Sequence, residues 1–438
     1  MRSPPEPAEP LEIGEREDSL ALMCELQARL GDIYRVYAPS RRGYVYVINH
    51  PDDVRRVLIS NHANYLKGFG LDRVRILLGN GIVTSDGELW RRQRYMMQPM
   101  FHRRTLDRFA ETIEAANARL LTRWERWSAD GVPINVTEQM SALTLDFILH
   151  AIFGRDLALL SAGEEENPFA IIAGDSARDL AFAHKVYRLR RLVAEIAARR
   201  TVGDEEFDLL GLLLQARDKN TGAPMSEREL VDEVMTLIIA GHETAASTLN
   251  SVWFLLSQHP RVEARMHAEI DAFAPGSAID FRLSDALVYT RRIIEEALRL
   301  YPPVWVMSRR SVQADRLAGY EIPAGTELLL SPYLVHRHPQ FWSDPEAFDP
   351  DRAEPGTSSG GSALARIPFG AGARRCIGDA LAMYEMSLHL YCAGRRFRLL
   401  HAPSPPFELD ARINLRSRRP IHMQLEMRAA RAGPAPRH

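Results

Sequence analysis

The stretch from Ser226 to Pro260 constrains the fold most, because it predicts one unusually long helix. Ser226 and Glu229 form an S-x-x-E capping box at its start. At 1.5 Å per residue, such a helix runs about 45–50 Å and would cross the whole molecule. The pattern stops at His259-Pro260. Its apolar residues, which recur with helical spacing, are Leu230, Val231, Val234, Leu237, Ile238, Ala245, Leu249, Val252, Leu255 and Leu256.

Shorter patterns complete the predicted fold. Alternation in Tyr44–Ile48 predicts a strand, and Pro51 suits the first turn of a following helix. Helical patterns dominate from Asp86 to about Arg217. Further strands are expected after Pro303 and within 397–400 and 421–427, and a helix is expected near residue 376. The sequence therefore predicts a mainly α protein with a small β region.

We find no internal repeat and no clean linker, so residues 18–428 are expected to form a single large domain. Residues 1–17, rich in proline and glutamate, predict a flexible N-terminal arm, and 429–438 a C-terminal tail. With 46% hydrophobic residues and a formal charge of -2, the composition is that of a globular protein and gives no sign of nucleic-acid binding. No early apolar run suits a membrane span or a secretory signal, which predicts a cytoplasmic protein.

The segment Phe369–Gly378, FGAGARRCIG, surrounds the most informative of only three cysteines. Two glycines allow a tight turn that brings backbone N–H groups towards the sulfur of Cys376. The arginines and a helix that begins just beyond favour thiolate over thiol. A thiolate in such a loop can donate electrons to haem iron. Cys24 and Cys392 lack these surroundings and are interpreted as small buried hydrophobic residues.

This segment resembles the haem-binding pattern of the cytochrome P-450 family, F-G-x-G-x-R-x-C-x-G, at every fixed position. The resemblance implies that Cys376 is the axial ligand to the iron of heme b. It also implies that Arg374 donates to a haem propionate and that Phe369 borders the cofactor. Because the family's motifs follow in order from about residue 39 to 427, the resemblance implies the cytochrome P-450 fold.

The middle of the long helix, Ala240-Gly241-His242-Glu243-Thr244, resembles the family's oxygen-activation pattern A-G-x-E/D-T. A threonine hydroxyl can bond back to a carbonyl one turn earlier and bend the helix locally. Ala240 and Gly241 lack bulk, so that bend could form a groove for dioxygen. The resemblance implies that Thr244 hydrogen-bonds the bound oxygen and that Glu243 helps to relay protons. It gives His242 no role as a ligand.

Glu296 and Arg299 form an E-x-x-R pair, which resembles the family's core ion pair because Tyr301-Pro302-Pro303 follows it. The resemblance implies that Arg352 is the third member of this structural triad. Here alanine follows Arg352 in place of the usual aromatic residue, so we expect local repacking.

Trp90 and Arg94 are spaced i, i+4, which places an indole N–H and a guanidinium on one helix face that suits a haem carboxylate. By resemblance, Arg310 is a further propionate contact, although its neighbour Arg309 remains an alternative. A cofactor held in this way needs no covalent attachment.

By resemblance, the substrate pocket is bordered by several apolar segments, which predicts a hydrophobic small-molecule substrate such as a terpenoid, a fatty acid or a macrolide. The expected pocket residues are Phe69, Leu71, Ile76, Phe182, Leu237, Trp305 and Val306.

The resemblance implies a haem-thiolate monooxygenase that inserts one oxygen atom from O2 into a C–H bond, by hydroxylation or also epoxidation. A chain without a flavin or iron–sulfur segment predicts electrons from NAD(P)H through a separate ferredoxin or flavodoxin with its reductase, and a monomeric enzyme. A basic face that would attract an acidic donor is expected from Arg91, Arg92, Arg103, Arg104, Arg375, Arg395 and Arg396. Two alternatives stay open: a peroxide-driven peroxygenase, which the Glu243-Thr244 pair disfavours, and a non-catalytic haem sensor or carrier.

Overall fold

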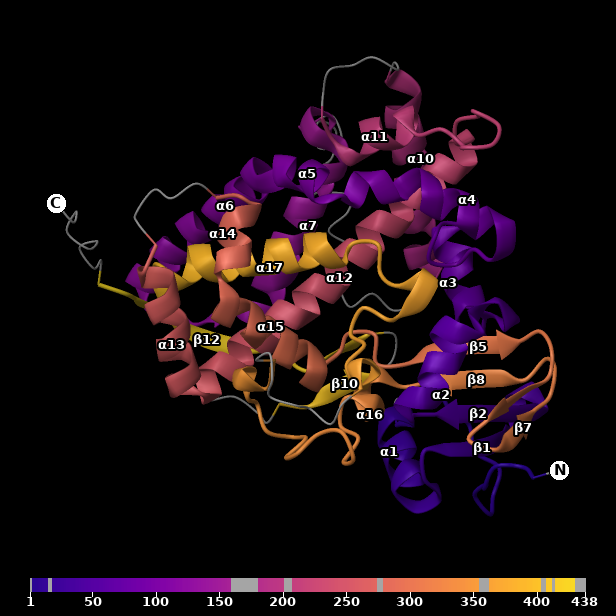
Figure 1. Ribbon diagram of the computed structural model, residues 1–438. Helices are drawn as coiled ribbons and strands as arrows, with labels where there is room; N and C mark the ends of the chain where they lie inside the picture. The colour runs from indigo at the N-terminus through magenta and orange to yellow at the C-terminus, as the bar shows by residue number, and fades with distance from the viewer. Residues whose placement is uncertain are drawn as a thin grey trace. The chain divides into compact units, whose positions relative to one another are not determined.

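The computed structural model describes residues 2–14, 18–158, 180–200, 207–273, 279–353, 362–402, 407–411 and 414–429. They group into two compact units. Unit 1 comprises residues 1–73, 295–377 and 407–418, and unit 2 comprises 74–294, 378–406 and 419–438. The two units interleave along the chain, so no single linker separates them and no boundary between them could be recognised in the sequence. The prediction of a mainly α protein with a small β region is confirmed (Figure 1).

Unit 1 is built on a five-stranded sheet with the strand order β1-β2-β8-β5-β3 (Figure 1). Strands β2 and β8 are parallel, and the other neighbours are antiparallel. Two small two-stranded sheets, β6-β7 and β10-β11, belong to the same unit. The strands are β1 (Ile33–Ala38), β2 (Gly43–Ile48), β3 (Tyr65–Lys67), β5 (Met307–Ser311), β6 (Asp315–Leu317), β7 (Tyr320–Ile322), β8 (Glu327–Leu330), β10 (Leu409–Ala411) and β11 (Leu415–Ser417).

The helices of unit 1 are short. Helix α2 continues directly into a π-helical turn, η2, whose Asn61 N–H donates to the Arg56 carbonyl at 2.8 Å. The helical segments are α1 (Ser19–Leu30), η1 (Pro39–Arg41), α2 (Pro51–Arg55), η2 (Arg56–Ser60), η3 (His62–Asn64), α16 (Pro332–Val335), η7 (Pro350–Ala353), η8 (Ala363–Ala365) and η9 (Gly372–Arg374). Helices α3 (Leu71–Leu78) and α15 (Val288–Leu300) include residues of both units.

Residues 2–14 do not form the loose arm that their composition predicted. The Arg35 N–H donates to the Pro5 carbonyl at 3.0 Å, and the Leu11 N–H donates to the Tyr37 carbonyl at 3.0 Å. Ile13 is buried in the core of unit 1. This segment therefore lies along β1, and its backbone hydrogen bonds and buried side chain outweigh the solvating effect of its prolines and glutamates.

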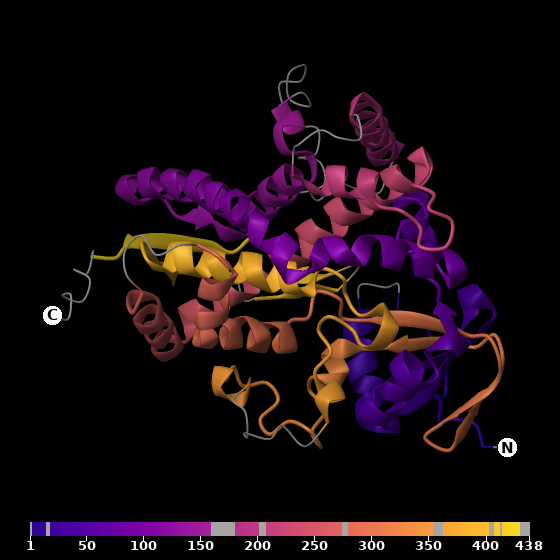
Figure 2. The same cartoon turned by 45° about the horizontal axis from the view of Figure 1, so that its top comes forward.

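Unit 2 is helical and is organised around the long helix α12, which runs from Glu227 to Gln258 over 32 residues. Ser226 caps it, and both hydrogen bonds of the predicted capping box with Glu229 are present. Helices α7, α10, α11, α13 and α17 contact it, and it lies in their midst (Figures 1 and 2). The helix ends before Pro260, the first residue of α13, as the sequence predicted.

The other elements of unit 2 surround this helix. A three-stranded sheet of order β4-β12-β9 packs against α6, α7 and α12. The elements are α4 (Gly87–Met97), η4 (Gln98–Phe101), α5 (Arg103–Leu106), η5 (Asp107–Phe109), α6 (Ala110–Asp130), β4 (Ile134–Asn135), α7 (Val136–Phe153), η6 (Gly154–Asp156), α10 (Leu180–Arg199), α11 (Leu209–Gln215), α13 (Pro260–Asp271), α14 (Phe281–Ala286), α17 (Asp379–Gly394), β9 (Phe397–His401) and β12 (His422–Met427). Within the described ranges, no helix is both long and apolar enough to cross a membrane.

Candidate active site

The loop that precedes α17 in sequence belongs to unit 1 and places Cys376 at its exposed end. The backbone folds on itself: the Cys376 N–H donates to the Phe369 carbonyl at 2.9 Å, and the Arg375 N–H donates to the Gly372 carbonyl at 3.1 Å. The Gly370 N–H donates to the Ile367 carbonyl at 2.9 Å. These main-chain bonds fix the loop and so fix the position of the cysteine.

Gly372 is required for two reasons. Its φ is +69°, in the left-handed region. In addition, a Cβ there would lie 2.1 Å from the carbonyl oxygen of Leu58, in the π-helical turn η2. The loop therefore lies directly on the backbone of another segment. Gly370, with φ +70°, needs glycine for its conformation only, since a Cβ would make an ordinary 4.0 Å contact with Met307 Sδ.

The three cysteines differ in exposure. Cys376 is exposed, whereas Cys24 and Cys392 are partly buried. Burial raises the pKa of the Cys24 thiol and raises that of Cys392 to about 12, so both stay protonated at neutral pH. An accessible cysteine on a loop fixed by backbone hydrogen bonds could hold a haem iron through its sulfur, as thiolate ligands do in haem-thiolate enzymes.

Glu296, Arg299 and Arg352 come together in unit 1. The Arg299 guanidinium donates to both Glu296 carboxylate oxygens, at 2.8 and 2.7 Å, and Arg352 Nε lies 3.5 Å from Glu296 Oε1. Arg299 is completely buried, and its remaining N–H groups donate to the carbonyls of His336, Pro345 and Ala347. Because every donor faces an acceptor, this buried ion pair fastens the loop around 343–349 to α15.

The middle of α12, in unit 2, shows the back-bonded threonine that the sequence predicted. Thr244 Oγ1 donates to the Ala240 carbonyl at 2.8 Å. Ala240 is exposed and Thr244 is half-buried, although the turns of α12 on either side are almost fully buried. The side chain of Ile148 on α7 lies 3.1 Å from the position of a Cβ on Gly241. The helix therefore presents a small, accessible polar spot in an otherwise enclosed element.

His242 faces the opposite way from this spot and is buried against α7. Its Nε2 lies 3.0 Å from Ser141 Oγ, and its carbonyl accepts from Thr144 Oγ1 at 3.2 Å. Burial lowers the pKa of His242 to about 4, so the ring is neutral. His242 thus serves to hold α7 on α12, which agrees with its lack of a predicted ligand role.

Helix α4 carries Trp90 and Arg94, both half-buried, on one face. Between them, Arg92 is fully engaged: its guanidinium binds Glu229 and Asp218 and donates to the Pro224 carbonyl at 3.1 Å. Trp90 and Arg94 are thereby carried on a helix that is tied to the start of α12. Their indole and guanidinium suit a carboxylate such as a haem propionate.

A family model identifies the chain. The model described as Cytochrome P-450 matches residues 9–194 and 185–423, which together span most of the sequence. The chain belongs to the cytochrome P-450 family.

Curated relatives and a solved structure support the same family. Cyclooctat-9-en-7-ol 5-monooxygenase from Streptomyces melanosporofaciens is 35% identical over 402 residues, covering 88% of this chain and 86% of the relative. Pentalenene oxygenase from Streptomyces avermitilis is 32% identical over 403 residues, covering 88% and 87%. The crystal structure of the heme domain of cytochrome P-450DA has a TM-score of 0.87 at 25% identity and covers 98% of each chain. The protein is a cytochrome P-450 monooxygenase with a haem iron cofactor, which uses O2 and an external electron donor.

The two candidate propionate arginines of this cytochrome P-450 lie on opposite faces of β5. Arg309 is buried and its Nη1 donates to the Ser308 carbonyl at 2.8 Å. The Arg310 side chain is 53% exposed and lies 4.0 Å from Glu327 Oε1. Of the pair, Arg310 has the accessible guanidinium, and its role as a propionate contact stays a prediction.

The predicted pocket residues fall into three groups. Leu71 and Val306 are half-buried, so part of each side chain is accessible, whereas Leu237 is buried at 8% exposure. Phe69 and Trp305 instead belong to the hydrophobic core of unit 1, and Trp305 is 0% exposed, which argues against a pocket role for it. The side chains of Ile76 and Phe182 lie outside what the structure describes.

Several arginines expected to form a basic face have acidic or tyrosine partners. Arg103 binds Asp285, Arg396 binds Glu125 at 2.8 Å, and Arg395 donates to the Tyr391 hydroxyl at 2.6 Å. With Arg92 also paired, these side chains contribute less positive potential than their number suggested.

Sequence reasoning missed a pair of acids in unit 2. Asp232 and Glu233 lie on the second turn of α12 and are almost completely buried. A signal was present, because the two residues interrupt the apolar pattern between Val231 and Val234. Burial raises the pKa of Glu233 to about 8, and polar side chains in such a position need hydrogen-bond partners.

Proposed function

We propose that this cytochrome P-450 hydroxylates a terpenoid or a similar cyclic hydrocarbon at an unactivated C–H bond. The observation that carries the monooxygenase chemistry is the exposed Cys376 on a loop fixed by its own backbone. Two relatives support the substrate class, since their names describe oxygenation of pentalenene and of cyclooctat-9-en-7-ol. The partly accessible apolar side chains of Leu71 and Val306 agree with such a substrate.

Each predicted residue has a defined task in this proposal. Cys376 ligates the iron of heme b, and Trp90, Arg94, Arg310 and Arg374 bind its propionates, with Phe369, Ala240 and Gly241 beside the cofactor. When bound, the haem supplies the activation of O2. Thr244, held by its bond to the Ala240 carbonyl, presents its hydroxyl oxygen to a proton donor, and Glu243 delivers protons from solvent.

The structural triad of Glu296, Arg299 and Arg352 acts through the loop that it fastens. Removing one partner of a buried pair leaves an uncompensated charge, so this arrangement keeps unit 1 in one conformation. Electrons are proposed to come from NAD(P)H through a separate ferredoxin or flavodoxin with its reductase, and the enzyme is proposed to act as a monomer.

A Soret titration of the purified haem protein tests the substrate class. A cyclic terpene hydrocarbon, a fatty acid and a macrolide are added separately, and turnover with a surrogate ferredoxin and reductase is measured for each. The proposal predicts a low-spin to high-spin shift and a hydroxylated product with the terpene only. A shift and product with the fatty acid or the macrolide, and none with any terpene, would contradict the proposed substrate class.

A further inference from the structure

The buried acids Asp232 and Glu233 on α12 have no part in the chemistry described above. Asp232 Oδ2 accepts from the Asn80 backbone N–H at 2.7 Å, and Glu233 Oε2 accepts from the Ile82 backbone N–H at 3.0 Å. The two side chains are 2% and 0% exposed. Both carboxylates therefore hold the same backbone turn, residues 79–82, which follows α3.

The turn is shaped to lie directly on α12. Gly79 has φ +74°, and a Cβ there would lie 2.0 Å from Asp232 Oδ1. A Cβ on Gly81 would lie 2.3 Å from Thr236 Oγ1. A side chain at Gly79 would displace the Asp232 carboxylate, and a Cβ on Gly81 would also lie 2.8 Å from the Asp232 carbonyl oxygen in the backbone of α12. The sequence Gly79-Asn80-Gly81 thus matches the helix surface that receives it.

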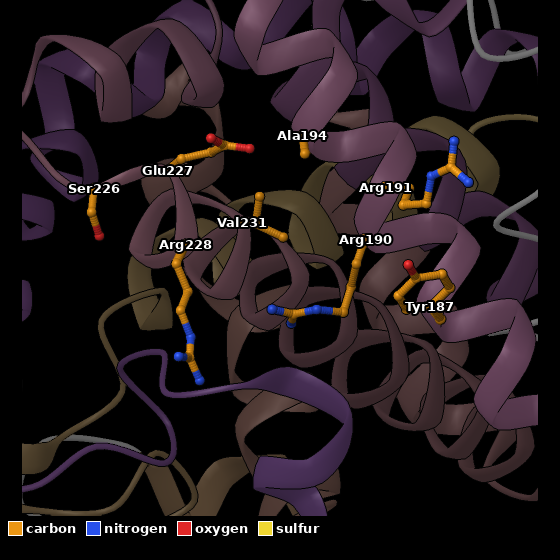
Figure 3. Close-up of a pocket in the computed structure, with 8 residues that line it drawn as sticks. All are labelled: Tyr187, Arg190, Arg191, Ala194, Ser226, Glu227, Arg228 and Val231. Atoms are coloured by element: carbon orange, nitrogen blue, oxygen red, sulfur yellow. The ribbon is translucent and has the colours of Figure 1, made fainter.

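Asp232 also holds a second element. Its Oδ1 accepts from Nη2 of Arg190 on α10, so one carboxylate binds α10 and the 79–82 turn at once. In Figure 3, the Arg190 side chain points towards the first turns of α12, whereas that of its neighbour Arg191 points away. The exposed fractions agree, at 24% for the Arg190 side chain and 66% for Arg191, whose guanidinium pairs with Glu195 on its own helix.

Solvent reaches this junction through one open pocket of about 470 Å³. It lies between α10 and the start of α12 and is lined by Tyr187, Arg190, Arg191, Ala194, Ser226, Glu227, Arg228 and Val231 (Figure 3). Arg190 borders this pocket, and Asp232 lies behind it at 3% side-chain exposure. Its guanidinium pairs with the buried Asp232 carboxylate and so keeps α10 in contact with α12.

The junction is close to the accessible spot of α12. Asp232 precedes Ala240 by eight residues, or about 12 Å along a helix. The turn and α10 thus pack on α12 about two turns before Ala240 and Thr244. From these contacts we infer that Asp232 is a positioning residue, which sets where α10 and the 79–82 turn stand beside the substrate-binding part of α12. The contacts themselves do not depend on the proposed function, but their effect on substrate binding rests on it.

The choice of aspartate follows from its two acceptor oxygens. An asparagine has the same shape but only one acceptor, so its NH2 group would face either the Asn80 N–H or the Arg190 guanidinium. One of the two links must then break. Glu233 offers no substitute, because it binds the turn and not α10 among the described contacts.

Hydrogen–deuterium exchange of the haem-loaded full chain, without substrate, tests the positioning. Asp232→Asn should raise exchange about tenfold or more in at least one of the peptides covering 79–82 and 186–193, since a hydrogen bond to a charged group contributes about 1.5–3 kcal/mol. Arg190→Ala should raise it in 186–193, and Glu233→Gln in neither α10 nor its flanks. Arg191→Ala is the matched control and should leave both peptides as in the unaltered chain. Wild-type exchange in Asp232→Asn and Arg190→Ala, or an equal rise in Arg191→Ala, overturns the inference.

Kinetics with a substrate that the Soret titration identifies test the consequence. Asp232→Asn and Arg190→Ala should raise KM about tenfold with kcat little changed and should alter the ratio of hydroxylated products. Arg191→Ala should change neither. Altered exchange with unchanged KM and product ratio would overturn the effect on substrate. Lack of any turnover by the unaltered chain would contradict the proposed function instead, while the exchange pattern would still decide the positioning.

Discussion

The cysteine loop of unit 1 and the centre of α12 in unit 2 carry the two most informative motifs, but they are built differently. In the loop, backbone contacts backbone: Cys376 N–H donates to the Phe369 carbonyl, and Gly372 lies against the Leu58 carbonyl. In α12, the motif consists of side chains on a regular helix, as in the hydrogen bond that the Thr244 hydroxyl donates to the Ala240 carbonyl. The first region should tolerate almost no change of shape, and the second should tolerate changes of shape better than changes of chemistry.

The difference has a physical basis. A carbonyl oxygen in a hydrogen-bonded turn cannot move without breaking the hydrogen bonds of that turn. A methyl group added against it therefore causes a steric clash that the backbone cannot relieve. A side chain such as Ile148 can change its rotamer by a small amount at little cost. Four substitutions test the comparison.

Replacing the reactive atom should have the largest effect. Cys376→Ser should abolish the thiolate-type spectrum of the reduced carbonyl complex and all monooxygenase turnover, because an alcohol does not replace thiolate as an electron donor to the iron. Absorption spectra and product formation measure this. Cys24→Ser is the control and should keep both, since Cys24 is partly buried away from the loop. A surviving thiolate spectrum in Cys376→Ser would mean that another residue is the ligand.

A methyl group at Gly372 should have the second largest effect. Gly372→Ala combines a positive φ with a 2.1 Å approach to the Leu58 carbonyl, and we expect a loss of about 3 kcal/mol or more in the free energy of unfolding. Gly319→Ala, with φ +82° and no atom within 4 Å of its Cβ, is the matched control. It should lose only about 1–2 kcal/mol from conformation alone. Equal losses in thermal or urea unfolding would show that the close approach contributes nothing.

Removing the hydroxyl at the centre of α12 should affect chemistry and spare stability. Thr244→Ala should lower the product formed per NAD(P)H consumed at least about tenfold, because a positioned proton-transfer group is lost. The unfolding temperature should hardly change. Thr248→Ala removes the same kind of back-bond, from Thr248 Oγ1 to the Thr244 carbonyl at 2.8 Å, but at a buried position. If Thr248→Ala lowered the product yield as much as Thr244→Ala, the hydroxyl of Thr244 would have no special role.

A methyl group at Gly241 should have the smallest effect on stability. The new Cβ would lie 3.1 Å from the tip of Ile148, which can move, and alanine favours a helix interior by about 1 kcal/mol over glycine. We expect Gly241→Ala to unfold within about 1 kcal/mol of the unaltered chain. Combining it with Ile148→Val should remove the closer contact, with Cδ1 at 3.1 Å, and leave the contact with Cγ1 at 3.3 Å. A loss as large as that of Gly372→Ala would erase the distinction between the two regions.

Much of the fold and of the candidate site could be predicted from the sequence because the decisive interactions are local. The capping box at Ser226, the back-bond of Thr244 and the spacing of Glu296 and Arg299 each involve residues three or four apart. Such distances are fixed by helix geometry before any tertiary contact forms.

What could not be predicted depends on partners that are distant in the chain. The carbonyl that requires Gly372 belongs to Leu58, and the amide that Asp232 binds belongs to Asn80. Their composition suggested that residues 2–14 form a loose arm, because composition does not reveal that their backbone forms hydrogen bonds with β1. Trp305 was assigned to a pocket by resemblance and for its apolar character, and an apolar side chain suits a core equally well.

The docked N-terminal segment has a consequence for self-association. β1 is an outer strand of its sheet, and an outer strand with unpaired amides invites pairing with another molecule. The segment occupies that edge and itself carries Pro4, Pro5, Pro7 and Pro10, which have no N–H to offer to a further strand. It thereby covers the edge of the sheet, and truncation at residue 14 should make the protein aggregate more readily as its concentration rises.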